Sequence, residues 1–324
     1  KTSTAARRII FDGKKAVGVE VENEQGQKEI IKCNKEIILS SGSLGTPHLL
    51  QHSGIGDGEL LQSLGIEVVV NSPDVGTNLQ DQLFAHLKFN VNNPRASINA
   101  KMSNKLRMAG EVLRWLIFKT GVMTSATSEV IGFIRSSDAV SRPDIQLAMK
   151  PYSFTISPED GAVTIHTEPG ITVSAILVQP HSTGTVKIDS PDPRKRPDLN
   201  INYLSDERDV QTLITGVEHL RNIMKQPAMA QHGPVEFEPG ENVTSEKDLE
   251  AHIRSHAETI YHPGCSCRMG TDDKAVTDPQ LRVNGVEGLR IADLSIMPKI
   301  IRGNTAAPAL MIGEKAADLV LADA

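Results

Sequence analysis

The sequence predicts an α/β (α+β) protein built from two domains, and three observations support this fold class. Apolar residues alternate along the first 40 residues, which is typical of strands. Apolar residues recur at helical spacing in 106–117 and again in 210–220. The chain closes with an apolar strand, a loop and a helical stretch over 289–320. At 324 residues with 39% hydrophobic residues, it is long enough to bury a real core.

The first 40 residues predict a β-meander that leads into a helix. An apolar strand over 9–11 is followed by the Asp12-Gly13 turn, by alternating valines over 17–21, and by a returning strand at 29–32. A short apolar strand over 36–40 then enters a turn of small residues over 41–47. Small residues let a backbone approach a ligand closely, and a helix N-terminus there favours an anion. Taken alone, the segment favours an ordinary tight turn between strand and helix.

The middle of the chain predicts a separate domain. A loop rich in turn residues over 73–81 marks the boundary, and extended segments from Phe84 onward predict a mostly antiparallel sheet with covering helices. One predicted helix of this domain begins with a capping box, Ser245 followed by Asp248. We interpret two apolar stripes as core-facing helix sides: Leu106, Ala109, Leu113, Leu116 and Ile117; and Val210, Leu213, Ile214, Val217 and Leu220.

Composition narrows the function classes. The formal net charge is -6 and the longest basic run is Arg194 to Arg196, so the sequence has no electrostatic footprint for nucleic acid and we expect a small-molecule partner. The apolar stretch 112–118 contains Arg114 and is far too short to span a membrane. Three cysteines do not make a disulfide framework, so we expect a reducing compartment, the cytoplasm.

No metal site is expected. His48 and His52 lie four residues apart, a spacing that metals use, but no third ligand accompanies them nearby. Cys265 and Cys267 form a Cys-x-Cys pair without a second pair, which is poor spacing for zinc. We interpret both cysteines as small buried side chains.

His262 is the first candidate for chemistry. It precedes Pro263, and Gly264 and Gly270 keep its surroundings out of regular structure. A neutral imidazole on such a loop is available as a base near neutral pH. Taken alone, the pattern favours an ordinary loop histidine.

The last 36 residues are the second candidate. A strand over 289–293 ends at Asp293, and Gly303 introduces a helix for which Asn304 or Thr305 serves as the N-cap. A strand, a loop and a helix N-terminus together present free backbone N–H groups to a phosphate or an electron-rich ring. An ordinary capped terminal helix is the alternative.

Taken in order, five segments resemble the glucose-methanol-choline (GMC) family of flavin-dependent alcohol oxidoreductases. GSLGTPHLLQHSGIG is similar to a family signature, and VGTNLQD resembles the loop that covers the flavin. The others are HSTGTVKIDSPDP, YHPGCSCRMG and GNTAAPALMIGEKAADL. The resemblance implies an incomplete Rossmann-like FAD-binding domain over 1–82 and 258–324, which lacks its N-terminal βαβ unit, and a substrate-binding domain over 83–257.

The resemblance also implies residue roles. His262 matches the catalytic histidine, and Asn304 matches its partner, which is His or Asn in the family. Ala292 and Asp293 match the strand end near the FAD pyrophosphate, Thr305 and Ala306 match residues whose N–H groups face the flavin, and Asn78 lies in the covering loop.

The sequence departs from the family pattern at three places. The Gly-x-Gly-x-x-Gly fingerprint is absent, so the chain resembles the C-terminal three-fifths of a complete enzyme and an N-terminal fragment becomes an expected partner. Gly264, Cys265 and Ser266 stand where the family usually has Val-Gly-Thr. Gln82 replaces a common histidine, a change expected to affect loop packing more than chemistry.

The predicted function is therefore FAD-dependent oxidation of an alcohol, with His262 as the base and hydride transfer to the flavin. The aromatic content of 3% favours aliphatic alcohols or polyols over aryl alcohols. The electron acceptor, oxygen or a quinone-like carrier, stays open. Two alternatives remain: a flavin-containing lyase or cyclase on the same scaffold, and a non-catalytic half-protein that cannot hold FAD.

Overall fold

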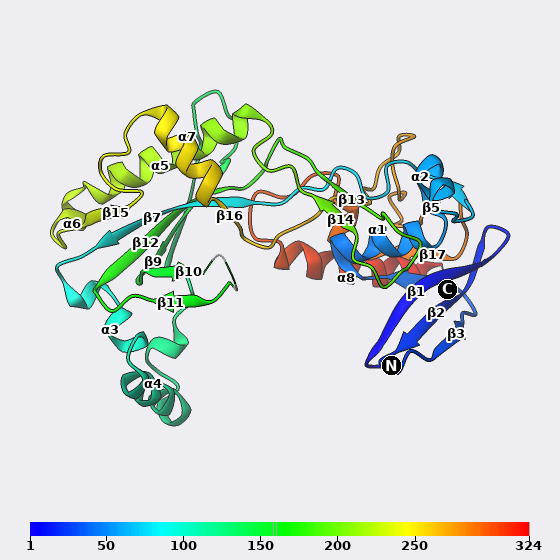
Figure 1. Ribbon diagram of the computed structural model, residues 1–324, viewed down its shortest axis with the longest axis horizontal. Coiled ribbons are helices and arrows are strands. Elements are labelled where there is room, and N and C mark those ends of the chain that lie inside the picture. The colour runs from blue at the N-terminus through cyan, green and yellow to red at the C-terminus, as the bar shows by residue number, and fades with distance from the viewer. Residues whose placement is uncertain (158, 160, 324) are drawn as a thin grey trace. The chain divides into compact units, whose positions relative to one another are not determined.

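The computed structural model describes residues 1–157, 159 and 161–323, and they form two compact units. Unit 1 comprises 1–82, 179–205 and the chain from Tyr261 onward, and unit 2 comprises 83–178 and 206–260. Figure 1 labels their elements. The mixture of helices and strands confirms the predicted α/β (α+β) class.

Unit 1 opens with the predicted β-meander. Strands β1 (Thr4–Asp12), β2 (Lys15–Asn23) and β3 (Lys28–Lys32) form an antiparallel sheet in that order. The turn between β1 and β2 depends on Gly13, whose φ of 58° lies in the left-handed region that favours glycine. The meander therefore follows from local sequence.

The rest of unit 1 joins segments far apart in the sequence. Strand β4 (Ile37–Leu39) pairs in parallel with β17 (Leu289–Ile291), and β5 (Ile55–Gly56) pairs in parallel with β6 (Val70–Asn71). The remaining elements of this unit are α1 (Gly42–His52), α2 (Gly58–Ser63), β13 (Thr185–Lys187), β14 (Asp198–Asn200), the 3₁₀ turn η3 (Leu294–Ile296) and α8 (Ala306–Ala322). The core of unit 1 includes Ile9, Leu39, Leu50, Ile55, Ile291, Ile296 and Ile312.

Residues 179–205 belong to unit 1, whereas the sequence-based boundaries assign them to the substrate-binding domain. Backbone hydrogen bonds fix them to the loop over 75–81: the Val186 N–H donates to the Gly76 carbonyl at 2.7 Å, and the Gly184 N–H to Leu79 at 2.8 Å. These bonds join positions more than 100 residues apart, which local patterns do not reveal.

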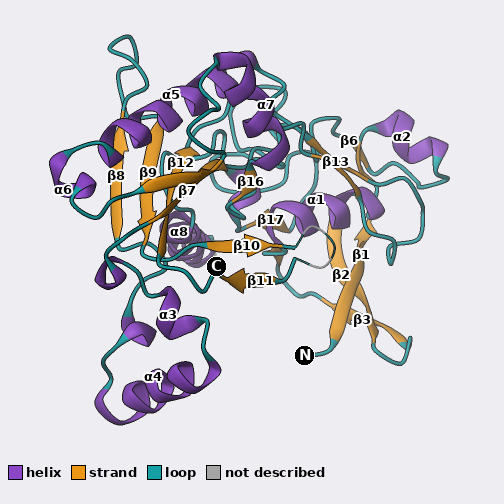
Figure 2. Ribbon diagram, turned by 60° about the vertical axis from the view of Figure 1, so that its left-hand side comes forward, coloured by secondary structure: helices purple, strands orange, loops and turns teal. Residues whose placement is uncertain are grey.

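Unit 2 is built on a mostly antiparallel sheet, as predicted. Its strands run in the order β15 (Val235–Glu238), β7 (Leu83–Asn90), β12 (Gly170–Leu177), β9 (Ile145–Lys150) and β8 (Val130–Ile134), and β16 (Glu258–Thr259) also pairs with β7. A hairpin of β10 (Phe154–Ile156) and β11 (Val163–Ile165) accompanies it. Figure 2 shows α5 (Glu207–Met224) lying along the sheet.

Helix α5 confirms the interpretation of its apolar stripe as core. Val210, Leu213 and Val217 are buried, and Gly216 lies so close to the sheet that an added Cβ would come within 2.6 Å of the Ala175 Cβ. Helix α7 (Glu246–His256) packs on α5 and begins at the predicted cap, where the Ser245 Oγ accepts from the Asp248 N–H at 3.1 Å. Helix α6 (Pro227–Ala230) is a single turn.

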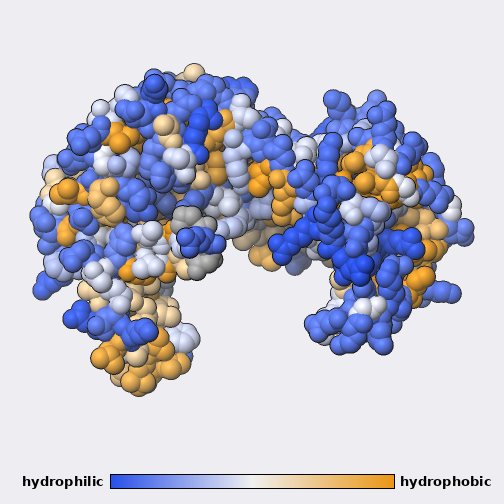
Figure 3. All heavy atoms as spheres, in the orientation of Figure 1, coloured by the Kyte–Doolittle hydropathy of each residue, from blue (hydrophilic) through white to orange (hydrophobic). Residues whose placement is uncertain are grey.

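For helix α4 (Lys105–Phe118), the interpretation of the apolar stripe as core is wrong. None of its residues is buried, and Leu106, Leu113 and Ile117 are 85%, 57% and 61% exposed. Apolar spheres gather over this helix in Figure 3. Helical spacing shows only that apolar residues share a face, and here that face is exposed within the described part of the chain. The neighbouring short elements are η1 (Pro94–Ala96), α3 (Asn99–Met102) and η2 (Val122–Thr124).

Across residues 1–157, 159 and 161–323, no helix combines the length and the apolar character that crossing a bilayer requires.

Candidate active site

His262 is held by its main chain against the loop over 78–82 in unit 1. Its backbone N–H donates to the Asp81 carboxylate at 2.9 Å. Two residues on, Gly264 and Gln80 exchange both backbone hydrogen bonds, at 2.8 and 3.1 Å. Gly264 suits this close approach, because an added Cβ would come within 2.5 Å of the Met297 methyl group. The loop that carries His262 is therefore fixed at several points.

The ring of His262 contacts Gln82. Its Nδ1 lies 2.8 Å from the Gln82 Oε1, while the Gln82 Nε2 donates to the carbonyls of Ile301 and Gly303 at 3.0 and 3.2 Å. Gln82 is fully buried. Its amide therefore contacts the imidazole as well as the loop that contains Ile301 and Gly303. Sequence reasoning singled out this position as a departure from the family pattern but missed the contact.

Burial lowers the pKa of His262 below its ordinary value of 6.5, and the neighbouring Asp81 carboxylate opposes that shift. The imidazole is therefore neutral at neutral pH, which is the protonation state that a general base requires.

Asn304 directly follows Gly303, whose carbonyl accepts a hydrogen bond from the Gln82 side chain. The side chain of Gln82 thus links the two segments that carry the predicted catalytic pair. Asn304 itself is exposed.

Helix α8 begins at Ala306 with Thr305 as its N-cap, one of the two predicted cap residues, but the Thr305 side chain makes no capping bond. The first N–H groups of a helix have no intrahelical partner. Ala306 and Ala307 are exposed, and Thr305 is buried. Small side chains around free donors suit a planar ring with carbonyl and nitrogen acceptors on its edge, so this helix end fits the pyrimidine edge of a flavin.

Asp293 serves as an internal brace. One carboxylate oxygen accepts from the Gly42 N–H at 2.9 Å and the Thr46 hydroxyl at 2.6 Å, and the other accepts from the Ser295 N–H at 2.8 Å. Ala292 donates its N–H to the Leu39 carbonyl at 2.7 Å. These bonds tie the end of β17 to the start of α1.

Asn78 also has a structural role. It adopts a left-handed backbone with φ of 57°, a conformation that asparagine tolerates better than most residues. Its side-chain nitrogen lies 3.4 Å from the Cys265 carbonyl and 3.3 Å from the Pro298 carbonyl. The predicted flavin-covering loop is thus held to the segments that follow His262 and β17.

Cys265 and Cys267 are fully buried, which confirms their interpretation as small core side chains. Their N–H groups donate to the Leu294 and Ser295 carbonyls at 3.1 and 2.8 Å. Burial raises the pKa of the Cys265 thiol to about 12, and it raises the pKa of Cys267 as well. Thiols with raised pKa values are poor nucleophiles, so the departure from the family pattern at Cys265 adds no reactive thiolate near His262.

His48 and His52 contact each other: their Nε2 atoms are 3.1 Å apart. The His48 Nε2 also lies 3.0 Å from the Lys195 carbonyl. Among the described residues, no group of three or more His, Cys, Asp or Glu side chains is placed to hold a metal ion.

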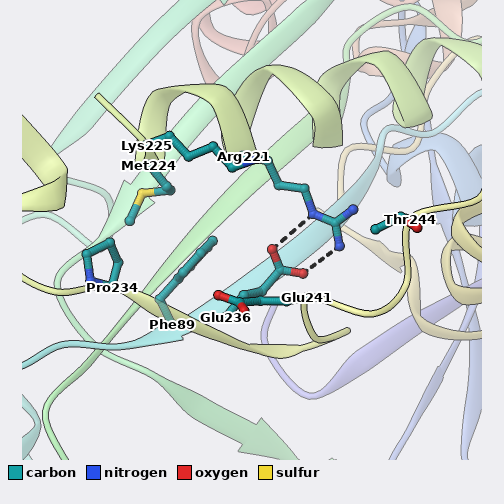
Figure 4. A pocket seen from close by; sticks show the side chains of 8 residues that line it. All are labelled: Phe89, Arg221, Met224, Lys225, Pro234, Glu236, Glu241 and Thr244. Carbon is teal, nitrogen blue, oxygen red and sulfur yellow. Dashed lines mark hydrogen bonds and ion pairs between the residues drawn. The ribbon is translucent and has the colours of Figure 1, made fainter. Parts of the chain in front are cut away.

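His262 lines neither of two pockets in the described structure. Figure 4 shows a pocket of about 360 Å³ in unit 2, where Arg221 forms a two-pronged ion pair with Glu236 at 2.6 and 2.9 Å. Arg221 also donates to the Val243 carbonyl at 2.8 Å, so its donors are engaged within the unit. A second pocket, of about 390 Å³, lies beside β1 in unit 1. Neither is lined by a predicted catalytic or cofactor-binding residue.

Comparisons with known proteins identify the family of this chain. The family models described as GMC oxidoreductase match residues 1–84 and 180–313. An oxygen-dependent choline dehydrogenase from Yersinia pseudotuberculosis is 40% identical over 98% of this chain, and one from Pseudomonas savastanoi is 39% identical over 98%. The chain belongs to the GMC oxidoreductase family.

Solved structures share the fold of this GMC chain. An FAD-dependent oxidoreductase from Chaetomium thermophilum superimposes with a TM-score of 0.88 at 26% identity over 100% of the chain and 61% of that protein. A formate oxidase from Aspergillus oryzae gives a TM-score of 0.88 at 25% identity over 99% of the chain and 60% of that protein. The chain spans 55% of the length of the curated choline dehydrogenases it matches.

Proposed function

We propose that this chain forms the catalytic part of an FAD-dependent enzyme that oxidises an alcohol to a carbonyl compound. The observation that carries the proposal is the bridge by Gln82 between the His262 ring and the loop that leads into α8. The bridge supports the proposal because, in a chain of the GMC family, it joins the loop of His262 to the loop that leads into α8.

His262 acts as the base. Its lowered pKa keeps the ring neutral near pH 7, so a ring nitrogen can take the proton of a bound alcohol hydroxyl. FAD, when bound, supplies the acceptor for the hydride that leaves the alcohol carbon. The rate of this step rises with pH through the pKa of His262 and levels off above it, because only the neutral ring accepts a proton.

Asn304 holds the substrate oxygen. Its side-chain amide can donate to an oxygen that becomes negative as the proton leaves, and a donor fixed beforehand stabilises that charge most effectively. Thr305 and Ala306 would hold the flavin edge through their N–H groups, and the backbone of Ala292 and Asp293 would approach the pyrophosphate. The Asp293 side chain is engaged internally, so its part is to fix that backbone. Asn78 would position the covering loop.

The substrate class we propose is a small aliphatic alcohol. The relatives named oxygen-dependent choline dehydrogenase make choline the first compound to test, with oxygen as the first electron acceptor and a quinone as the second. The cytoplasm is the compartment we propose, since the three cysteines are free thiols.

The test is anaerobic flavin bleaching in the complete, flavin-loaded protein with a panel of alcohols. We expect choline or another aliphatic alcohol to bleach the flavin, and His262→Ala to slow the bleaching ~10²-fold or more while FAD stays bound. His219→Ala, which removes an exposed histidine from α5, is the matched control and should keep the wild-type rate.

Three outcomes would contradict the proposal. Equal bleaching rates in His262→Ala and the wild type would remove His262 from the reaction. Product formation from an alcohol with the flavin still oxidised would instead favour the lyase or cyclase alternative. A purified complete protein without a flavin spectrum would favour the non-catalytic alternative.

A further inference from the structure

We infer that Gln82 is a positioning residue that sets the tautomer of His262, holding the ring proton on Nδ1 and leaving Nε2 bare for the substrate. The inference rests on the proposed function, in which His262 is the base. It also makes a statement about the ring itself that can be measured without any reaction.

Two backbone carbonyls determine the orientation of the Gln82 amide. Its Nε2 lies 3.0 Å from the Ile301 carbonyl and 3.2 Å from the Gly303 carbonyl. Both are acceptors, so the group facing them must be the NH₂ group, which has two protons to donate. A flipped amide would place its oxygen against two carbonyl oxygens in a fully buried position. The orientation with Oε1 toward His262 is therefore strongly preferred.

That orientation determines where the imidazole carries its proton. The Gln82 Oε1 can only accept a hydrogen bond, and it lies 2.8 Å from the His262 Nδ1. The Nδ1 atom must therefore carry the proton. In a neutral ring the other nitrogen is then unprotonated, and burial keeps the ring neutral by lowering its pKa.

Gln82 and Asp81 contact different atoms of His262. The Asp81 carboxylate accepts from the His262 backbone N–H at 2.9 Å and from the Tyr203 hydroxyl at 2.5 Å. Asp81 therefore fixes the main chain of His262, and its charge opposes the lowering of the His262 pKa by burial. The ring nitrogen is bonded to Gln82.

Gln82 also links the ring of His262 to the loop of Asn304. The two carbonyls that orient Gln82 belong to the loop that carries Asn304. One side chain thus couples the proton position on the base to the loop that holds its partner, so a shift of that loop would disturb both members together.

The experiment is ¹⁵N NMR of the chain labelled at histidine, with the His262 signals identified by their loss in His262→Ala. In the wild type we expect a protonated Nδ1 and an unprotonated Nε2. In Gln82→Leu the Nδ1 acceptor is gone, so the ring should move toward the Nε2–H form that free histidine prefers. Flavin reduction in the complete protein should slow about five- to tenfold, as expected for the loss of one hydrogen bond.

Gln80→Leu is the matched control. Gln80 belongs to the same loop, is 5% exposed, donates to the Asn78 side chain at 3.0 Å and accepts from the Ile300 N–H at 3.0 Å. It makes equivalent loop contacts without touching the imidazole, so the tautomer pattern of His262 should persist in this variant.

A second variant tests the electrostatics. In Gln82→Glu one carboxylate oxygen faces the Nδ1 proton, and the other loses the two bonds to the Ile301 and Gly303 carbonyls. The added negative charge favours the imidazolium form, so the pKa of His262 should rise. Because the neutral ring is then reached at higher pH, the rising limb of the flavin-reduction profile should move to higher pH. A defect confined to packing would lower the rate without moving that limb.

The inference is overturned if Nε2 carries the proton in the wild type. It is also overturned if Gln82→Leu leaves the tautomer unchanged, or if Gln80→Leu changes it as much as Gln82→Leu does. If none of the alcohols tested reduces the flavin of the wild-type enzyme, the proposed function is refuted instead. The NMR result still decides the position of the proton.

Discussion

His262 and Asp293 show how single residues acquire their roles in this chain. The sequence identified both positions, but the partners of each lie about 180 or 250 residues away. Asp293 accepts three hydrogen bonds within the protein, so its contribution is to brace the backbone. Gln82 occupies one ring nitrogen of His262 and leaves the other for the reaction that we propose.

The His48–His52 pair gives a pH prediction at this scale. Burial, with a smaller contribution from the charge of His48, lowers the pKa of His52 to about 4, while Asp192 opposes the shift. The unfolded chain binds the proton near pH 6.5, so it holds more protons than the folded chain below that pH. The stability of unit 1 should therefore fall as the pH drops from 6.5 toward 4.

Urea unfolding between pH 7.5 and 4.5 checks this prediction. His52→Gln should flatten the pH dependence, whereas His219→Gln, at an exposed position on α5, should reproduce the wild-type curve. If stability depends as steeply on pH in His52→Gln as in the wild type, other groups cause that pH dependence.

At the scale of elements, α4 and α5 show that periodicity and burial are separate properties. Both helices carry an apolar stripe at helical spacing. The stripe of α5 packs on β12, β7 and β9, but the stripe of α4 is exposed within the described chain. A helical face becomes core only when another element lies over it.

Matched substitutions on these helices test the difference. Leu113 on α4 is 57% exposed and Leu213 on α5 is fully buried. Leu113→Gln should change the free energy of unfolding by no more than about 0.5 kcal/mol. Leu213→Gln should cost about 2–5 kcal/mol, because it removes buried apolar contacts and buries an amide. Urea unfolding followed by circular dichroism measures both, and equal losses would show that α4 is covered.

At the scale of the whole molecule, the chain alternates between two units that have separate cores. Unit 1 is assembled from three separate stretches, and the parallel pairing of β4 with β17 joins positions about 250 residues apart. Arg290 reinforces this pairing: its side chain is 4% exposed and contacts Glu36 at 2.6 Å, the Gln280 carbonyl at 2.8 Å, and Asp323.

Arg290→Met should destabilise unit 1 by ~3 kcal/mol, because it leaves the Glu36 carboxylate without its partner. Hydrogen exchange should then quicken at unit 1 amides and stay unchanged in unit 2. Arg282→Ala is the control, since Arg282 pairs with Asp278 but its side chain is 52% exposed, and its effect should stay within about 0.5 kcal/mol. Equal acceleration in both units would show that they unfold together.

The sequence by itself determined the features that local chemistry specifies. Alternating residues and the Asp12-Gly13 turn predict the meander, Ser245 marks the start of α7, and the ordered motifs around His262 and Asn304 identify the family. The tertiary structure alone decided that residues 179–205 join unit 1, that the stripe of α4 is exposed, and that Gln82 contacts the His262 ring. Each of these depends on contacts between distant segments, and the spacing of residues along a chain carries no information about which distant segment will cover or contact them.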